Sequence, residues 1–144
     1  MVRSIEFFQL LDTAYAQCRK PLCRELELPQ TALDILLFLA NNPEYTTARD
    51  IVEVRHLKAN LVSVNVTRLV DEGYLRRLAA AGDRRKTLLE LTEKAEPIVA
   101  RGREFQKEFY EKLLLGVSQG DREALSRILG NLEQNLEKIA REDG

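Results

Sequence analysis

The sequence predicts a mainly α-helical protein of the α+β class, with a single β-hairpin past its midpoint. Apolar residues recur with helical periodicity through most of the 144 residues. Only two short segments alternate in the manner of strands, and a Gly-Asp pair typical of a turn lies between them. A chain of this length usually forms one domain, so we expect the helices and the hairpin to form one compact unit.

The first predicted helix covers residues 5–26 and carries a broad apolar face. Phe8, Leu11 and Tyr15 recur at spacings of three and four, and neighbouring apolar residues widen the face. A face of this width indicates burial on two sides, for instance in an interface. Pro21 lies inside the pattern and should kink or end the helix near residue 20.

Two shorter helices are expected next, joined by a tight connection. The helix over residues 29–41 is apolar nearly all round, which predicts the core helix, and Pro29 suits its first turn. The following helix begins after Thr47, an N-cap residue whose capping-box partner would be Asp50. A short break over residues 56–59 then leads into another helix. This arrangement is typical of a helix-turn-helix.

The fourth predicted helix, residues 57–73, separates apolar and polar residues onto two faces, and Gly73 suits the left-handed residue after its end. Its apolar face holds Val62, Val66, Leu69 and Val70. Its opposite face holds Asn60, Leu61, Val64, Thr67 and Arg68. Leu61 and Val64 allow two interpretations: they contact thymine methyl groups, or the helix turns differently and they are core residues.

A β-hairpin with a basic tip should follow this helix directly. Its strands are predicted over residues 74–79 and 87–91, and the Gly82-Asp83 pair marks the turn. A helix followed at once by a basic hairpin can place the helix in a DNA major groove and the hairpin tip against the neighbouring backbone or minor groove.

Two long amphipathic helices should end the chain. Thr92 is expected to cap a helix over residues 93–117, although Pro97 should move the helix start toward residue 96. The final helix, residues 121–141, carries a strong apolar stripe and a charged opposite face.

The net charge of −1 hides a segregation of charge along the chain. Residues 55–86 hold eight Lys and Arg against three acids, a net charge of +5, whereas the segments before and after each carry −3. A basic middle between acidic ends favours local, oriented contact with a polyanion.

Several other classes of function are disfavoured. No apolar run approaches the roughly 20 residues that span a bilayer, and the start of the chain lacks the features of a signal peptide, so we expect a cytoplasmic protein without a membrane partner. His56 is the only histidine, and no set of metal ligands accompanies it. With no nucleophile–base pair either, we expect no metal, no cofactor and no enzymatic activity.

The run of residues 46–92 resembles the MarR family of winged-helix transcription regulators. The resemblance rests on VTRLVDEGYLRR at residues 66–77, DRR at residues 83–85 and LELT at residues 89–92. The flanking helices match the family in number and order, so the resemblance covers nearly the whole chain. Family members typically repress transcription, and many release DNA on binding a small aromatic ligand or on thiol oxidation.

The resemblance implies a homodimer that binds a pseudo-palindromic site on double-stranded DNA. It implies a winged helix-turn-helix DNA-binding region over residues 29–92 and helical dimerisation regions over residues 1–28 and 93–144. Arg85 would reach the minor groove, with Asp83 holding its guanidinium, and ligands would bind between the dimer helices and the winged unit. The DNA-binding residues expected on this basis are Lys58, Asn60, Ser63, Val64, Thr67, Arg68, Asp83, Arg84, Arg85 and Lys86.

Two alternatives to a ligand-responsive repressor remain open. Cys18 or Cys23 could make the protein a thiol-based redox sensor, although the family's peroxide sensors carry their reactive cysteine earlier, near residue 5, and cysteines on apolar faces usually act as small hydrophobic residues. Alternatively, the net charge and the apolar Leu61 and Val64 fit a protein-interaction module that has lost DNA binding.

Overall fold

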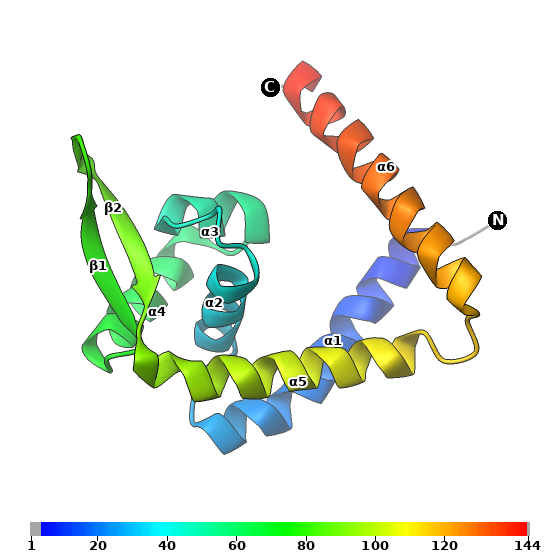
Figure 1. Ribbon diagram of the computed structural model, residues 1–144, viewed down its shortest axis with the longest axis horizontal. Coiled ribbons are helices and arrows are strands. Elements are labelled where there is room, and N and C mark those ends of the chain that lie inside the picture. The colour runs from blue at the N-terminus through cyan, green and yellow to red at the C-terminus, as the bar shows by residue number, and fades with distance from the viewer. Residues whose placement is uncertain (1–3, 144) are drawn as a thin grey trace. The chain divides into compact units, whose positions relative to one another are not determined.

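The computed structural model describes residues 4–143, and its elements follow the predicted order (Figure 1). The elements are α1 (Ser4–Leu26), α2 (Gln30–Asn41), α3 (Ala48–Arg55), α4 (Ala59–Asp71), β1 (Leu75–Ala80), β2 (Asp83–Leu91), the short 3₁₀ helix η1 (Glu93–Ala95), α5 (Glu96–Leu113) and α6 (Gln119–Asp143). The two strands form one antiparallel sheet. The predicted α+β class is therefore confirmed.

The chain divides into two compact units, Met1–Phe109 and Tyr110–Gly144. The first contains every element from α1 to β2 and most of α5, and the second contains the end of α5 and all of α6. The predicted dimerisation and DNA-binding regions follow other boundaries, and that division stays a prediction. Residues 1–3 and 144, which belong to the predicted dimerisation region, lie outside the described residues.

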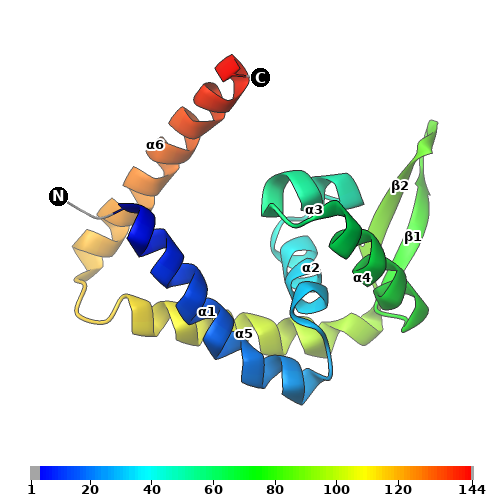
Figure 2. The same cartoon turned by 180° about the vertical axis from the view of Figure 1, so that it is seen from behind.

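Helix α2 is the centre of the first unit, as its apolar sequence predicts. Figure 2 shows it between α3 and α4 on one side and α1 and α5 on the other. Its fully buried side chains include Leu33, Ile35, Leu36 and Leu37. Helix α4 packs its predicted apolar face against this core, with Val62, Val66 and Leu69 buried. The first unit is thus built around one helix with almost no exposed surface.

The predicted range of the first helix, residues 5–26, is confirmed, since α1 runs from Ser4 to Leu26. Of the two effects expected of Pro21, a kink or an end near residue 20, the end is therefore wrong. The part beyond Pro21 supplies Leu22 and Cys23, which are buried in a cluster with side chains of α2 and α5. We infer that this packing offsets the roughly 3 kcal/mol that an interior proline costs a helix.

The N-terminus of α3 forms the predicted capping box. The Asp50 backbone N–H donates to Thr47 Oγ1 at 3.1 Å, and the Thr47 N–H donates to Asp50 Oδ2 at 3.1 Å. Burial tends to raise the pKa of Asp50, but hydrogen bonds from Thr47 and Thr46 outweigh it and hold the pKa below its usual value. The start of the helix-turn-helix is therefore fixed by local contacts that the sequence displays.

The last two helices differ from their predicted bounds. Helix α5 starts at Glu96, as Pro97 indicates, but it ends at Leu113 rather than near residue 117. Gly116 takes the left-handed conformation with φ +84°, and Arg122 donates to the carbonyl oxygens of two residues in this turn. These contacts stabilise an earlier turn, so α6 already begins at Gln119.

Helix α5 approaches α2 closely at Gly102. A Cβ atom added there would lie 2.5 Å from Leu37 Cδ2, and Leu37 is only 2% exposed. We expect Gly102→Ala to lower the free energy of unfolding by about 1–3 kcal/mol, because a full core must shift to accept the methyl group. Urea denaturation followed by circular dichroism measures this loss.

Gly130 in α6 provides the matched control for this substitution. A Cβ atom there would meet no atom within 4 Å among the described residues. Gly130→Ala should therefore leave the protein as stable as before or stabilise it by about 0.5–1 kcal/mol, since alanine favours a helix over glycine. Equal losses for both substitutions would show that close packing at Gly102 is not the cause.

A buried ion pair joins α1 to α2. Arg19 Nη1 donates to both carboxylate oxygens of Asp34 at 2.8 Å, and Arg19 Nη2 donates to Gln30 Oε1 at 3.0 Å. Arg55 of α3 adds a second cation, with Nη2 3.6 Å from Asp34 Oδ2. Both members of the pair are buried. One carboxylate therefore connects three helices, which the sequence patterns did not predict.

Candidate nucleic-acid interface

Helix α4 exposes the polar face that the sequence predicts. Lys58 is its N-cap residue and is also exposed. The exposed residues of the following turns include Asn60, Leu61, Ser63, Val64, Thr67 and Arg68. Leu61 is 43% exposed and Val64 is 67% exposed, so the interpretation that places them in the core is wrong. A mixed polar and apolar surface is available along the whole helix.

The connection from α3 to α4 is tight because His56 takes a left-handed conformation. His56 follows the last residue of α3 with φ +59° and ψ +43°. Leu57 packs against the core cluster directly afterwards, and α4 begins at Ala59. The sole histidine thus has a structural position at the turn, which fixes the direction of α4 relative to α3.

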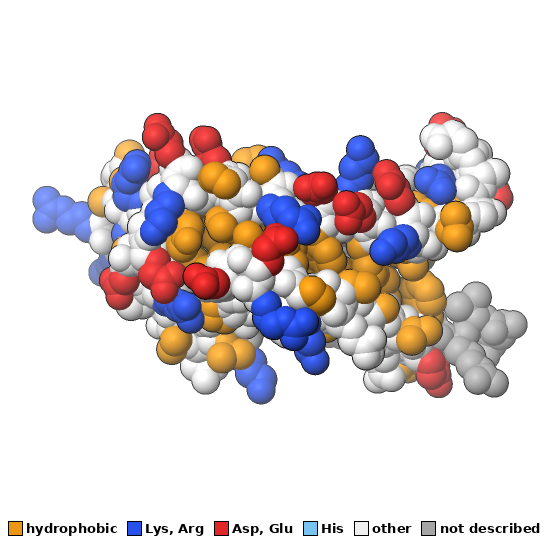
Figure 3. Space-filling model, turned by 90° about the horizontal axis from the view of Figure 1, so that it is seen from below, with side chains coloured by type: hydrophobic (Ala, Val, Ile, Leu, Met, Phe, Trp, Pro, Cys, Tyr) orange, Lys and Arg blue, Asp and Glu red, His pale blue; other side chains and the backbone are white. Residues whose placement is uncertain are grey.

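The hairpin carries its basic residues in an irregular part of the ladder. The strands pair in regular register from Leu75 opposite Leu91 to Ala79 opposite Thr87, but Ala80 then pairs with Asp83. Residues 84–86 therefore lie in a bulge rather than in the predicted loop. All three of these basic residues are exposed. Lys and Arg side chains project at the left edge of Figure 3, the side on which Figure 1 draws the hairpin tip.

Asp83 shapes the backbone of this bulge. Its Oδ1 accepts a hydrogen bond of 2.9 Å from the backbone N–H of Arg85. The resemblance to the MarR family implies instead that Asp83 holds the Arg85 guanidinium, and no such ion pair occurs among residues 4–143. In the free chain the guanidinium of Arg85 is left available for a partner.

The hairpin is attached to the helix-turn-helix by direct hydrogen bonds. The Leu89 N–H donates to the carbonyl oxygen of Thr46 at 2.7 Å, just before α3 begins. Arg77 Nη2 of β1 donates to Thr67 Oγ1 of α4 at 3.2 Å. These bonds hold the basic bulge at a fixed place relative to the exposed face of α4, so a single partner can contact both.

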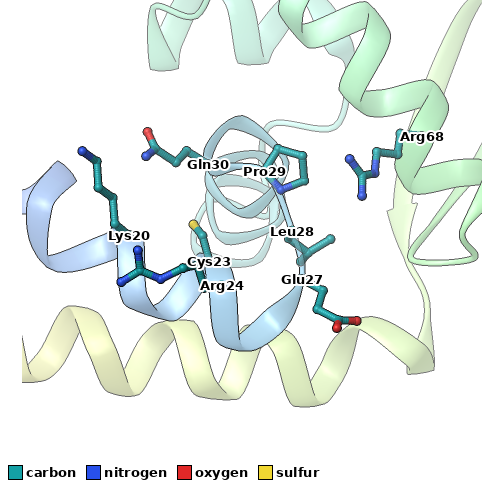
Figure 4. Close-up of a pocket in the computed structure, with 8 residues that line it drawn as sticks. All are labelled: Lys20, Cys23, Arg24, Glu27, Leu28, Pro29, Gln30 and Arg68. Carbon is teal, nitrogen blue, oxygen red and sulfur yellow. The ribbon is translucent and has the colours of Figure 1, made fainter.

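Arg68 lies apart from the other predicted DNA-binding residues. Its Nε donates to Glu72 Oε1 at 2.9 Å, and its side chain lines a cavity of about 440 Å³ between α1, α2 and α4. Figure 4 shows Lys20 and Arg24 of α1 and Gln30 of α2 around the same cavity. Three cations from two helices therefore line this cavity, together with the carboxylate of Glu27.

The two cysteines differ in their exposure to solvent. Both are free thiols; Cys18 is exposed and Cys23 is buried. Burial raises the pKa of the Cys23 thiol, which disfavours the reactive thiolate. The part of the chain that the structure describes has no cluster of His, Cys, Asp and Glu suited to a metal ion, and none of its helices is long and apolar enough to cross a membrane.

A helix-turn-helix followed by an attached basic hairpin defines a winged-helix protein. The hairpin of β1 and β2, residues 75–91, is the wing of this fold. The MarR family model matches residues 26–86, from the end of α1 into the wing. The crystal structure of the transcriptional regulator PA3341 has 27% sequence identity and a TM-score of 0.73, and the match covers 92% of this chain and 98% of that one.

Two further solved structures show the same fold at lower identity. A MarR family transcriptional regulator from Listeria monocytogenes, complexed with 26mer DNA, has 15% identity and a TM-score of 0.83, with 96% of this chain and 92% of that one covered. The transcriptional regulator SlyA has 17% identity and a TM-score of 0.79, with 96% of each chain covered. The resemblance is therefore confirmed: residues 26–86 match the MarR family model, and the chain has the winged-helix fold of MarR-family transcriptional regulators.

Proposed function

We propose that the protein is a sequence-specific transcription regulator that binds double-stranded DNA as a homodimer and represses transcription until a small ligand releases it. The observation that carries this proposal is the hydrogen-bonded attachment of the basic bulge to the exposed face of α4. A helix of this kind enters the major groove, and a basic hairpin beside it reaches phosphates or the minor groove. The neighbour bound to 26mer DNA supports this arrangement.

In this proposal, some residues of α4 and of the hairpin contact DNA bases and others contact the DNA backbone. Asn60, Ser63 and Thr67 can hydrogen-bond to base edges or phosphates. Lys58 lies at the start of α4, where it can contact a phosphate. The guanidinium of Arg85 suits the negative potential of a narrow minor groove, and Arg84 and Lys86 supply phosphate contacts beside it.

The homodimer is supported by apolar surface on both terminal helices. On α1, Ile5, Phe7, Phe8 and Leu10 are between 47% and 70% exposed. On α6, an exposed apolar stripe comprises Leu125, Ile128, Leu129, Leu132, Leu136 and Ile139. Covering these faces with a second copy would hold two α4 helices about one turn of DNA apart, near 34–36 Å.

The cavity between α1, α2 and α4 supports the response to a ligand. Its volume of about 440 Å³ suits a small molecule. Lys20, Arg24 and Arg68 outnumber Glu27 among its charged lining residues, and this excess of positive charge favours an aromatic ligand with an acid group. A ligand that favours another arrangement of α1 and α4 would lower DNA affinity through its preference for that state.

Arg85→Ala should weaken operator binding by about 1–3 kcal/mol, because it removes a charged groove contact. Fluorescence anisotropy against an operator selected from random duplexes measures the loss at matched salt. The control is Arg127→Ala, which removes an exposed arginine from the charged face of α6. This variant should bind the operator with the affinity of the parent protein.

The same titration separates DNA binding from the protein-interaction alternative. Phosphate contacts give a negative slope of log affinity against log salt concentration, because binding releases counterions. A flat or absent response, or equal affinity for Arg85→Ala and the parent, would contradict the proposed function and favour an interaction module.

A further inference from the structure

The exposed face of α4 has an apolar centre. Val64 lies at i+4 from Asn60 and at i+3 from Leu61, so it is next to both on the helix surface. It is 67% exposed, although α4 has a separate buried stripe that serves the core. A scattered apolar residue needs no special explanation, but two adjacent ones at the centre of a face predicted to enter the major groove suggest a specific contact.

We propose that Val64, with Leu61 beside it, contacts thymine C5-methyl groups in the major groove, and that Asn60 binds an adenine in the same half-site. This inference rests on the proposed function, since α4 must lie in the groove. Thymine presents a methyl group there, which apolar side chains contact, and asparagine can pair with N6 and N7 of adenine. The centre of each half-site would therefore consist of A·T pairs.

Few groups that read G·C pairs lie within residues 59–70 of this helix. Residues 59–70 contain no Asp or Glu, so no carboxylate of this stretch can accept a hydrogen bond from the N4 amino group of cytosine. Arg68 is the one Lys or Arg in the stretch, and its Nε already donates to Glu72. Its side chain also lines the cavity toward α1 and α2. The usual arginine contact with guanine is thus disfavoured.

The surrounding charge favours DNA over a protein as the partner of this apolar centre. Lys58 lies at the start of the helix, and the wing attached to it carries three consecutive basic residues. The whole segment 55–86 has a net charge of +5. In addition, valine is stiff at χ1, so placing it against a methyl group costs little side-chain entropy.

The test uses the full-length protein and an operator selected from random duplexes. We expect A·T pairs at the centre of each half-site. Thymine is then replaced by deoxyuridine at one position at a time, which removes only the methyl group. At one or two positions per half-site, affinity should fall about four-fold, the effect of burying one methylene-sized group.

Val64→Ala should abolish the difference between thymine and deoxyuridine at the contacted position, because the methyl group loses its partner. Val54→Ala is the matched control, since Val54 is 40% exposed on α3 and lies outside the exposed face of α4. The control should retain the full difference. Val64 is exposed, so its truncation should leave the thermal unfolding midpoint almost unchanged.

Two outcomes would overturn the inference, and they are distinguishable. Tight, salt-dependent operator binding with no loss at any deoxyuridine position would refute methyl recognition and leave the proposed function intact. Absence of binding to every duplex would refute the proposed function together with the inference.

Discussion

Asp34→Ala should lower the free energy of unfolding by about 3–5 kcal/mol, because it leaves the buried Arg19 without its charge partner. Arg19 Nη1 contacts both oxygens of Asp34 at 2.8 Å, and its Nε is already buried without a hydrogen-bond partner among the described residues. Loss of the carboxylate would leave the guanidinium with the Gln30 amide oxygen and the face of the Tyr15 ring, whose centroid lies 5.5 Å from Arg19 Cζ, and neither carries a compensating charge. Chemical denaturation of the purified protein measures the change.

The matched control is an exposed pair of the same type. Arg49 and Glu53 lie 2.7 Å apart with side chains 84% and 56% exposed, so Glu53→Ala should cost at most about 1 kcal/mol. A double variant, Arg19→Met with Asp34→Leu, should recover most of the loss because it removes both buried charges. If Asp34→Ala costs no more than the exposed control, the buried pair does not stabilise the fold.

The pH dependence of stability gives a second readout of Asp34. Burial raises the pKa of this carboxyl above its usual value of 3.8, and the opposing attraction of Arg19 and Arg55 does not cancel that effect. The folded chain therefore holds the proton more tightly than the unfolded chain. The stability linked to this proton is fully present below pH 3.8 and is lost as the pH rises through the folded-state pKa.

Leu132→Glu in α6 should convert the protein to a monomer and abolish tight operator binding. Leu132 is 48% exposed and lies in the middle of the apolar stripe. A carboxylate placed in an apolar dimer interface loses its hydration without gaining a partner, a cost of several kcal/mol. About 3 kcal/mol already weakens dimerisation more than 100-fold. Sedimentation velocity at micromolar concentration measures the oligomeric state.

Leu115→Glu is the control for this experiment. Leu115 is 84% exposed but lies in the turn before α6, outside the stripe. The Leu115→Glu substitution should leave both the dimer and its affinity for the operator unchanged. If the parent protein sediments as a monomer, or if the dimer survives Leu132→Glu, the stripe is not the proposed dimer contact.

Local patterns in the sequence were sufficient to predict which residues of α4 are buried and which are exposed. Three-residue and four-residue spacings separated the buried Val62 and Val66 from the exposed face of α4. The Thr47–Asp50 capping box and the left-handed Gly73 were also confirmed, because each depends on residues close in sequence. The roles of the individual DNA-binding residues stay predictions.

Features that depend on distant contacts were not predictable in this way. Arg19 and Asp34 are 15 residues apart, and nothing in the spacing of either helix shows that they meet. The bulge at residues 84–86 depends on strand register, so the alternation of residues could not distinguish it from a loop. An end of the helix at Pro21 was expected because the sequence shows the local cost of an interior proline. The sequence does not show the packing of Leu22 and Cys23 against α2 and α5, which lies beyond it.

Sharing one carboxylate between Arg19 and Arg55 has a mechanical consequence. A displacement of α1 that withdraws Arg19 would leave Asp34 paired with Arg55 alone, 3.6 Å away on α3. The remaining ion pair would then join α2 to α3 without α1, so the position of α1 would affect the contacts of the first helix of the helix-turn-helix. Asp34 therefore couples a displacement of α1 to the ion pair that joins α2 and α3.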